Sequence, residues 1–403
     1  MNKPYVLITV FFVAHLIHHI ITALLVPLLP FLRSELSINY TQTGLLVSAF
    51  SVMYGICQIP AGWLSDYLGR PFLVMIGISG VALCGLFVGI SQTYTTLIIF
   101  FALMGILGGA YHPASVSLIS KGVRAKERGR ALGIHMIGGS LSHFLAPLLV
   151  GFFAINYSWR VPYVGLSLPT MVFGIFLYLF TKDLEKNKHS TSSISHEKER
   201  PTLSYILRLA PFIVLSSVGG AASFSMLPFV PLFLVDHFGI RREIAASMIS
   251  LFYFSGLWGS FIGGYLADRF KVINITIMAC FLLGINIFLI TLSAHGWIIG
   301  LLLLLIGMVH YIRVVTSETH ILNQTTDKNR STIIGLYYFS TVESGGILTP
   351  VIGFLVDNYG FANTFKIVAI LVLLITIIFF VVHKNMIEKY SSNNLNSTVE
   401  QIY

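Results

Sequence analysis

The chain has 403 residues, of which 55% are hydrophobic and only 10% are charged, and its mean hydropathy is +0.82. Because so few charged side chains cannot cover the surface of a soluble protein, the composition excludes that class and predicts an integral membrane protein. The formal net charge is +9. Three cysteines lie inside apolar runs, and an odd number of such thiols argues against a disulfide framework.

Apolar runs follow one another along the whole chain, and each is long enough for a helix, which takes ~20 residues to cross the hydrocarbon core. The twelve runs lie roughly at 5–31, 41–65, 71–91, 95–119, 131–155, 161–180, 208–235, 243–267, 272–294, 297–321, 332–356 and 361–383. The sequence therefore predicts an all-α integral membrane fold with twelve transmembrane helices. The first run is too long for the core of a signal peptide, so we expect it to stay as an uncleaved anchor.

A polar stretch rich in Lys, Glu, Ser and His separates the sixth run from the seventh. We therefore predict an N-terminal six-helix bundle (1–180), a cytoplasmic linker (181–204), a C-terminal six-helix bundle (205–383) and a polar cytoplasmic tail (384–403). Most lysine and arginine residues fall in the loops on the side of the N-terminus, which places both termini in the cytoplasm. These loops fit contact with lipid headgroups, so we expect no nucleic-acid partner.

The two halves of the chain repeat each other. A single shift of 202 positions aligns four separate places, namely Asp66 with Asp268, Gly105 with Gly307, Arg128 with Arg330, and Gly151 with Gly353. One shift that serves so many places indicates a duplicated unit, and the equal sidedness of the halves predicts two parallel repeats related by a pseudo-two-fold axis.

The loop between the second and third runs carries the most specific motif. It is built on Gly62, Leu64, Asp66, Gly69 and Arg70, and it returns after the eighth run as Gly264, Leu266, Asp268 and Arg269. The glycines permit a tight turn, and the charges stand where the chain leaves the bilayer and can cap or pair with a helix end. The motif resembles the Gly-x-Leu-x-Asp-Arg-x-Gly-Arg-Lys loop of the major facilitator superfamily. Tyr67 and Pro71 replace basic residues of that pattern, and Lys271 and Val272 depart from it in the second copy.

This resemblance implies a secondary transporter in a prokaryotic cytoplasmic (inner) membrane, working as a monomer in the lipid bilayer. It implies two bundles that rock around a midplane site, with helices 1, 4, 7 and 10 lining the cavity and 2, 5, 8 and 11 flanking it. The partners are then a small-molecule substrate and a coupling ion, and we expect no cofactor, no metal and no enzymatic activity. The chain has no Walker A pattern, so the driving force is an ion gradient or the substrate's own gradient.

Two finer resemblances concern the fifth and fourth runs. Gly138, Gly139, Pro147 and Gly151 resemble the helix 5 motif of drug/proton antiporters. Tyr111-His112-Pro113, together with His15, is similar to fosmidomycin-resistance-type exporters. The chain departs from many antiporters because residues 95–119 contain no arginine and the first run contains no acid.

Ionisable residues near the middle of a membrane span are costly, so a function is the default hypothesis for them. The candidates for the substrate and proton pathway are His15, His18, His19, His112, His310, Arg313 and Glu343. Arg313 is always charged and needs a counter-ion, a substrate anion or water. Glu343 is the acid near the midplane, and we expect it to carry a proton together with the helix 1 histidines. His135, His143 and His320 read as neutral, hydrogen-bonding core residues.

Prolines repeat within the two halves. Pro27 and Pro30 in the first run are echoed by Pro228 and Pro231 in the seventh, with the same spacing within each pair. They predict a bend or break in each helix.

The interpretation we adopt is a proton-coupled transporter that moves a small organic solute, an anionic metabolite or a drug-like compound, with efflux favoured. An uptake symporter or uniporter for a small polar metabolite is the alternative. His15-Leu-Ile-His18-His19 also spells the H-x-x-H-H box of membrane desaturases, which would make the chain a metalloenzyme. That class needs several such boxes, and the other ten histidines are dispersed along the chain. A receptor on a transporter fold is a third possibility, although no soluble domain is attached.

Overall fold

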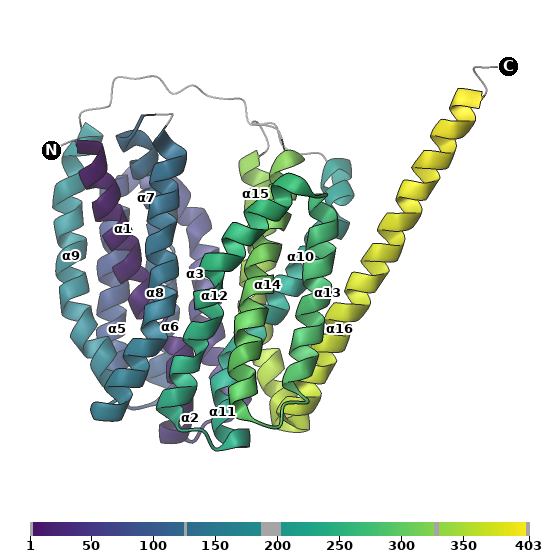
Figure 1. Ribbon diagram of the computed structural model, residues 1–403. Coiled ribbons are helices and arrows are strands. Elements are labelled where there is room, and N and C mark those ends of the chain that lie inside the picture. The colour runs from purple at the N-terminus through teal and green to yellow at the C-terminus, as the bar shows by residue number, and fades with distance from the viewer. Residues whose placement is uncertain (1–2, 125–126, 187–202, 326–329, 400–403) are drawn as a thin grey trace.

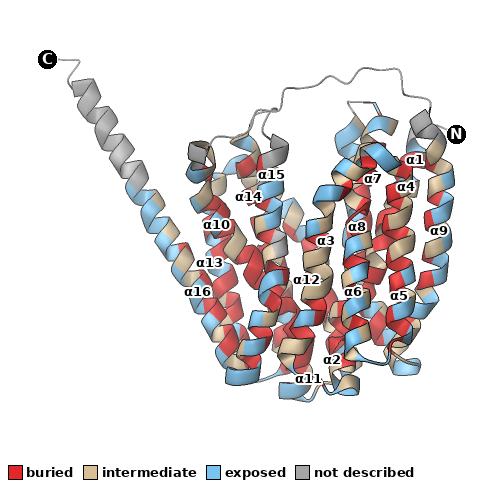
Figure 2. Ribbon diagram, turned by 180° about the vertical axis from the view of Figure 1, so that it is seen from behind, coloured by how far each residue is buried: buried red, intermediate tan, exposed pale blue. Residues whose placement is uncertain are grey.

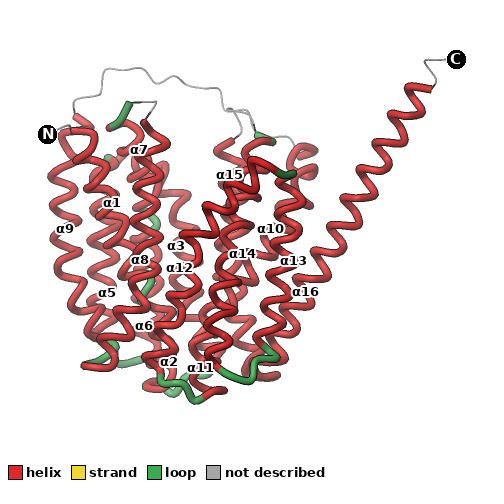
Figure 3. Tube along the Cα trace, viewed as in Figure 1, coloured by secondary structure: helices red, strands yellow, loops and turns green. Residues whose placement is uncertain are grey.

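The computed structural model describes residues 3–124, 127–186, 203–325 and 330–399, and within these ranges the chain forms helices and short loops without a strand (Figure 3). In the first half the helices are α1 (Lys3–Thr22), α2 (Leu25–Leu36), α3 (Tyr40–Leu68), α4 (Arg70–Met75), α5 (Val81–Ile90), α6 (Tyr94–Gly108), α7 (Tyr111–Gly122), α8 (Arg128–Asn156) and α9 (Arg160–Lys186). In the second half they are α10 (Leu203–Met226), α11 (Val230–Phe238), α12 (Arg242–Arg269), α13 (Val272–Ile290), α14 (Gly296–Asn323), α15 (Arg330–Tyr338) and α16 (Ser344–Val399).

Eleven helical runs in this part of the chain are long and apolar enough to cross a membrane. The last of them, Ile333–Asn385, is 53 residues long and contains two of the predicted spans. They meet at Gly360, whose φ of 76° and ψ of 167° are not helical and which ends one span and begins the next. The prediction of an all-α fold with twelve spans is confirmed in this form.

Several spans are interrupted, and the proline pairs explain two of the interruptions. Helix 1 breaks between α1 and α2, just before Pro27, and helix 7 passes through a 3₁₀ turn, Leu227–Phe229, that contains Pro228. Helix 4 breaks in the same way, between α6 and α7 at Gly109 and Ala110, and Pro113 stands at the third residue of α7 as Pro27 stands at the third residue of α2. Helices 3 and 11 contain π-helical segments, Ile76–Gly80 and Phe339–Glu343, whose wider turns are frequent at functional sites.

The two halves of the chain meet at the end of the molecule opposite the termini, and Figure 1 shows their helices further apart toward the termini. At the meeting end Asp236 accepts hydrogen bonds from Arg33 Nη1 at 3.1 Å and from the Tyr40 hydroxyl at 2.7 Å. Asp357 accepts from the backbone N–H groups of Tyr40 at 2.9 Å and Thr41 at 2.8 Å. We call Arg33, Tyr40, Thr41, Asp236 and Asp357 the closed-end latch.

Glycines let the backbones of neighbouring helices touch. A Cβ on Gly105 of α6 would lie 2.3 Å from the carbonyl oxygen of Phe50 in α3. A Cβ on Gly44 of α3 would lie 2.8 Å from the carbonyl oxygen of Thr349 in α16, which joins the two halves. Inside a membrane no hydrophobic force drives helices together, so they associate through close packing that small residues permit, as these glycines do.

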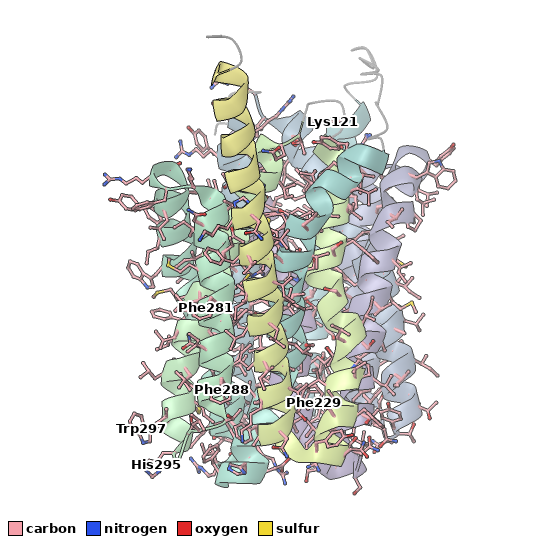
Figure 4. The ribbon with its side chains drawn as sticks, turned by 90° about the vertical axis from the view of Figure 1, so that its right-hand side faces the viewer. Lys121, Phe229, Phe281, Phe288, His295 and Trp297 are labelled. Carbon is pink, nitrogen blue, oxygen red and sulfur yellow. The ribbon has the colours of Figure 1, made fainter. Side chains whose placement is uncertain are left out.

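The outer faces of the helices carry the exposed apolar side chains that a bilayer would cover (Figure 2). Phe281 on α13 and Trp297 at the start of α14 are both exposed on this surface. Figure 4 shows Trp297 and His295 at the opposite end from Lys121. Tryptophan is typical of the membrane–water interface, which fits that position.

The linker and the tail differ in how they can be compared with the sequence. The predicted linker, 181–204, lies mostly outside the described residues, since α9 ends at Lys186 and α10 begins at Leu203. The tail is helical as far as Val399, where we had expected only a polar extension. Residues 384–399 contain neither glycine nor proline, so nothing in the sequence interrupts the twelfth helix there.

Candidate functional site

Six histidines gather in the N-terminal half, and we call them the six-histidine cluster. They are His15, His18 and His19 of α1, His112 of α7, and His135 and His143 of α8. Ring centroids are 4.7 Å apart for His15 and His19, and 5.1 Å apart for His15 and His112. The inference that the remaining histidines are dispersed is therefore wrong in space, because helix packing brings three of them to the helix 1 group.

His15 is held by α8. Its Nδ1–H donates to the carbonyl oxygen of His135 at 2.7 Å, and the two rings stack with centroids 4.1 Å apart. Gly139 makes room for this ring, since a Cβ there would lie 2.6 Å from His15 Cε1. Gly138 lets α8 approach α1, because its Cβ would lie 2.4 Å from the carbonyl oxygen of Phe12.

His18 is fixed by the neighbouring helices 2 and 3. Its Nδ1–H donates to the carbonyl oxygen of Gly77 at 3.2 Å, and its Nε2 accepts from the Tyr54 hydroxyl at 3.2 Å. Gly77 belongs to the π-helical segment Ile76–Gly80, where the ordinary helical ladder is altered and a carbonyl can take an outside donor. The His18 ring also stacks on Tyr111, with centroids 4.4 Å apart.

His19 and His112 face each other where helices 1 and 4 are both interrupted. The two Nε2 atoms are 3.1 Å apart, and His19 Nδ1 lies 3.3 Å from Thr22 Oγ1. The Thr22 hydroxyl donates to the His19 carbonyl at 3.2 Å, so its oxygen accepts from His19 Nδ1–H. His19 Nε2 therefore carries a lone pair, and His112 Nε2–H donates to it.

His135 and His143 complete the cluster from one face of α8. His135 Nδ1–H donates to the carbonyl oxygen of Phe11 at 3.0 Å, and its buried Nε2 has no partner in the described structure. His143 Nδ1–H donates to the carbonyl oxygen of Gly139 at 2.9 Å. Its ring lies 5.1 Å from that of Tyr253 in α12, so His143 connects the cluster to the other half.

Sequence reasoning did not assign His135 and His143 to the pathway. A signal was present, because His135, Gly139 and His143 follow one another at intervals of four residues and share one face of a helix. What the sequence lacks is the register of α8 against α1. Within the described part of the chain, none of the hydrogen bonds of the six rings goes to a carboxylate.

Arg313 and His310 lie in the other half, on α14. Arg313 is only 1% exposed, and its Nη1 donates to the carbonyl oxygen of Ser216 at 2.8 Å. Its buried Nε has no partner among the described residues, and neither has His310 Nδ1. His310 is enclosed by aromatic rings, including Phe224 at 5.1 Å and Phe252 at 5.4 Å between centroids.

Two further ionisable residues of the C-terminal half follow from the sequence, His320 as a core residue and Glu343 as a pathway residue. The His320 ring packs against Phe212, with centroids 4.1 Å apart and the ring planes tilted by 40°. The backbone of Glu343 ends the π-helical segment Phe339–Glu343, but its side chain lies outside what the structure describes. Pairing between Glu343 and Arg313 therefore stays a prediction.

The loop motif between helices 2 and 3 shows the turn that its glycine predicts. Gly69 has a φ of 85°, in the left-handed region that favours glycine. Leu64 packs on the core cluster of the N-terminal half, whereas a Cβ on Gly62 would make only ordinary contact, 4.0 Å from Pro113. Arg70 opens α4, and the side chain of Asp66 lies outside the described residues.

The second copy of the motif is looser. Gly264 has no atom within 4 Å of a Cβ built on it, and Asp268 is exposed. Arg269 stacks over the Tyr265 ring at 4.5 Å. The loop between α12 and α13 contains no glycine turn, which fits the loss of the second motif glycine.

The remaining residues of the helix 5 motif contact the other half. A Cβ on Gly151 would lie 2.0 Å from Ser247 Oγ of α12, so this glycine permits α8 and α12 to touch. Pro147 is buried within α8. The motif thus serves two interfaces, with Gly138 and Gly139 against α1, and Gly151 against α12.

One group of side chains could hold a metal ion. His15, His19 and His112 each offer a ring nitrogen, and these nitrogens lie within 4.8 Å of one another.

Residues 11–350 match the family model described as the Major Facilitator Superfamily. The multidrug resistance protein MdtG of Proteus mirabilis is 28% identical over 87% of this chain and 89% of its own length. The hexuronate transporter of Escherichia coli K12 is 24% identical, covering 88% of both chains. The fosmidomycin resistance protein of the same strain is 24% identical over 90% of this chain and 89% of its own.

Solved transporter structures share the fold. A peptide transporter POT in complex with sulfate superposes with a TM-score of 0.78 at 14% identity, covering 94% of both chains. A bacterial homologue of the human lysosomal transporter Spinster, in an inward-facing and unoccupied conformation, gives 0.74 at 16% identity over 95% of both chains. At this identity the likeness shows the fold alone. Relatives and neighbours alike are transporters, not enzymes.

Proposed function

Because the chain belongs to the major facilitator superfamily, and is thus a multi-pass membrane transporter of small solutes, we propose that it couples proton movement to a small organic anion. The bundles 1–180 and 205–383 rock about a midplane site by alternating access in the cytoplasmic (inner) membrane, with export favoured. The observation that carries the proposal is the six-histidine cluster, whose rings are groups that can accept protons.

The protonation of the pair His19 and His112 is linked to the positions of helices 1 and 4. At 3.1 Å between the two Nε2 atoms, one proton fits between the rings and forms a hydrogen bond. A second proton there would point two N–H groups at each other, so the rings must part. Since His19 is in the last turn of α1 and His112 in the first turn of α7, their separation moves the interrupted helices 1 and 4.

Arg313 supports an anionic substrate. Its guanidinium is always charged, and its buried Nε lacks a partner in the described part of the chain. A protonated cluster and Arg313 together make both halves positive around the midplane, which suits a carboxylate or phosphonate. Glu343 is the proposed second proton carrier, because it ends a π-helical segment in the same half of the chain as Arg313.

The names of the relatives support two directions of transport. A multidrug resistance protein and a fosmidomycin resistance protein favour export. The hexuronate transporter supports uptake by proton symport as the second candidate, since hexuronates are sugar acids and a protonated cluster pairs naturally with an anion.

The test is a thermal-shift screen of the detergent-solubilised protein against hexuronates, other small organic anions and lipophilic cations. A ligand that binds the folded state raises its melting temperature by mass action. We expect anions to raise the melting temperature. Their apparent affinity should fall about tenfold or more in Arg313→Met, because a charged hydrogen bond is lost. Stabilisation by lipophilic cations alone would contradict the proposal.

Proton coupling is tested in the same preparation. In weakly buffered solution, binding of the stabilising anion should take up protons, and His19→Gln and His112→Gln should abolish this uptake. His320→Gln is the matched control, because His320 lies outside the cluster against Phe212. Equal uptake in all three variants would remove the cluster from the coupling mechanism.

A further inference from the structure

The three ring nitrogens of His15, His19 and His112 form a compact set that comes from two helices. They lie within 4.8 Å of one another, and the Nε2 atoms of His19 and His112 are 3.1 Å apart. In a tetrahedral zinc site with metal–nitrogen distances of about 2.0–2.1 Å, ligand nitrogens are about 3.3 Å apart. Small rotations of the imidazole rings would bring these nitrogens to that spacing.

The hydrogen bonds behind the rings already have the pattern that metal-binding histidines use. His15 Nδ1–H donates to the His135 carbonyl at 2.7 Å, which leaves its Nε2 with a lone pair. His19 Nδ1 lies 3.3 Å from Thr22 Oγ1, and its Nε2 likewise keeps a lone pair. A backbone or hydroxyl acceptor on the far nitrogen is what fixes the tautomer and the ring plane of a metal ligand. His112 offers the same lone pair at Nε2 once its ring proton moves from Nε2 to Nδ1.

The three histidines differ in burial. His15 is buried, whereas His19 and His112 are half-buried, so two of the three rings can be reached from outside the core. Three protein ligands with one position left for water are typical of exchangeable metal sites, while four closed ligands are typical of structural ones.

We propose that His15, His19 and His112 bind one divalent transition-metal ion of the cobalt, nickel, copper and zinc class. The donor set decides the class, because imidazole suits these metals and magnesium or calcium needs oxygen ligands. The ion bridges α1 and α7 where helices 1 and 4 are interrupted. It thereby holds His19 and His112 together, whereas the proposed transport cycle requires them to separate. This consequence rests on the proposed function.

Binding is tested on the purified full-length protein, prepared without a polyhistidine tag and treated with chelator. Cobalt(II) alone is the probe, and its visible absorption reports nitrogen coordination. We expect one equivalent to bind with the spectrum of a low-coordinate site and to raise the melting temperature. His112→Gln and His15→Gln should each weaken binding about tenfold or more.

The controls keep the proposal falsifiable even if one variant folds poorly. His295→Gln removes an exposed histidine at the far end of the molecule (Figure 4), and His320→Gln removes a half-buried one in the other half, so both should bind cobalt like the parent protein. His19→Gln serves if His15→Gln does not fold. Binding that is unchanged in the folded cluster variants, or lost in His295→Gln, would overturn the site.

The metal result and the transport result are separable. Cobalt binding at the cluster with no anion-dependent proton uptake would leave the metal site standing and remove the proposed coupling. Proton uptake without cobalt binding would do the reverse.

Discussion

At the scale of single residues, hydrogen bonds decide which buried polar side chains stabilise the fold. His18 is fully buried, and its Nε2 accepts the Tyr54 hydroxyl at 3.2 Å. Tyr163 is equally buried, but its hydroxyl has no partner in the described structure. The two buried tyrosines, Tyr54 and Tyr163, should therefore respond differently to the loss of the hydroxyl oxygen.

We predict that Tyr54→Phe lowers the free energy of unfolding by about 1–3 kcal/mol, because it leaves a buried acceptor on His18 unsatisfied. Tyr163→Phe is the matched control and should be neutral or stabilising, since it removes an oxygen that makes no hydrogen bond. The measurement is thermal unfolding in detergent. Equal melting temperatures for the two variants would show that the His18–Tyr54 contact does not stabilise the fold.

The sequence predicted the helix 1 histidines, His112 and Arg313 as buried polar groups from their place in apolar runs, and the structure puts them in the interior or half-buried. It did not predict the contact of His15 with His135, which are 120 positions apart. Such a contact depends on how two helices rotate against each other. Periodicity fixes the face of each helix but not the partner of that face.

At the scale of elements, backbone contact between helices depends on single glycines. A Cβ on Gly105 would meet the Phe50 carbonyl oxygen at 2.3 Å and Tyr54 N at 2.9 Å, and both are backbone atoms of α3. A flexible side chain could move aside, but a helix backbone moves only as a unit. Gly165 in α9 is also in a helix, yet nothing lies within 4 Å of a Cβ there.

We predict that Gly105→Ala lowers the free energy of unfolding by about 1–3 kcal/mol through overpacking. Gly165→Ala should change it by less than about 0.5 kcal/mol or stabilise the helix, because alanine is the better helix former. Thermal unfolding of both variants checks this. A Gly105→Ala protein as stable as the control would mean that α3 and α6 can separate without cost.

The sequence was most informative about elements. Length and hydropathy located the spans, and the proline pairs located the interruptions of helices 1 and 7. The break in helix 4 between α6 and α7 was not predicted, although Pro113 supplies the same signal as Pro27, because it has no matching partner in the other half. The two π-helical segments have no signal in the sequence, since a wider turn is set by tertiary contacts.

At the scale of the whole molecule, the repeat and the loop motif were enough to predict two bundles, and the family match agrees with that architecture. The closed-end latch was not predicted. Its charges, Arg33, Asp236 and Asp357, sit at helix ends in both halves, and only the relative position of the halves shows that they meet. A latch of this kind must open if the solute is to leave at this end.

Asp357 is the most informative member of the latch, because its carboxylate in one half caps α3 of the other half. It accepts the N–H groups of Tyr40 and Thr41 at the start of that helix, where a negative charge also meets the positive end of the helix dipole. Losing such a cap costs about 1 kcal/mol, which changes the ratio of two conformations about fivefold.

The measurement that tests alternating access most directly is the distance across this end, by double electron–electron resonance in a cysteine-free background. Spin labels replace the exposed residues Ser34 and Asn358, one in each half. We predict that Asp357→Ala increases a population with a longer distance. Glu35→Ala, which removes a carboxylate that bonds Arg160 within one half, should leave the distances unchanged. An unchanged distribution in Asp357→Ala, with and without the stabilising anion, would contradict a latch that opens during transport.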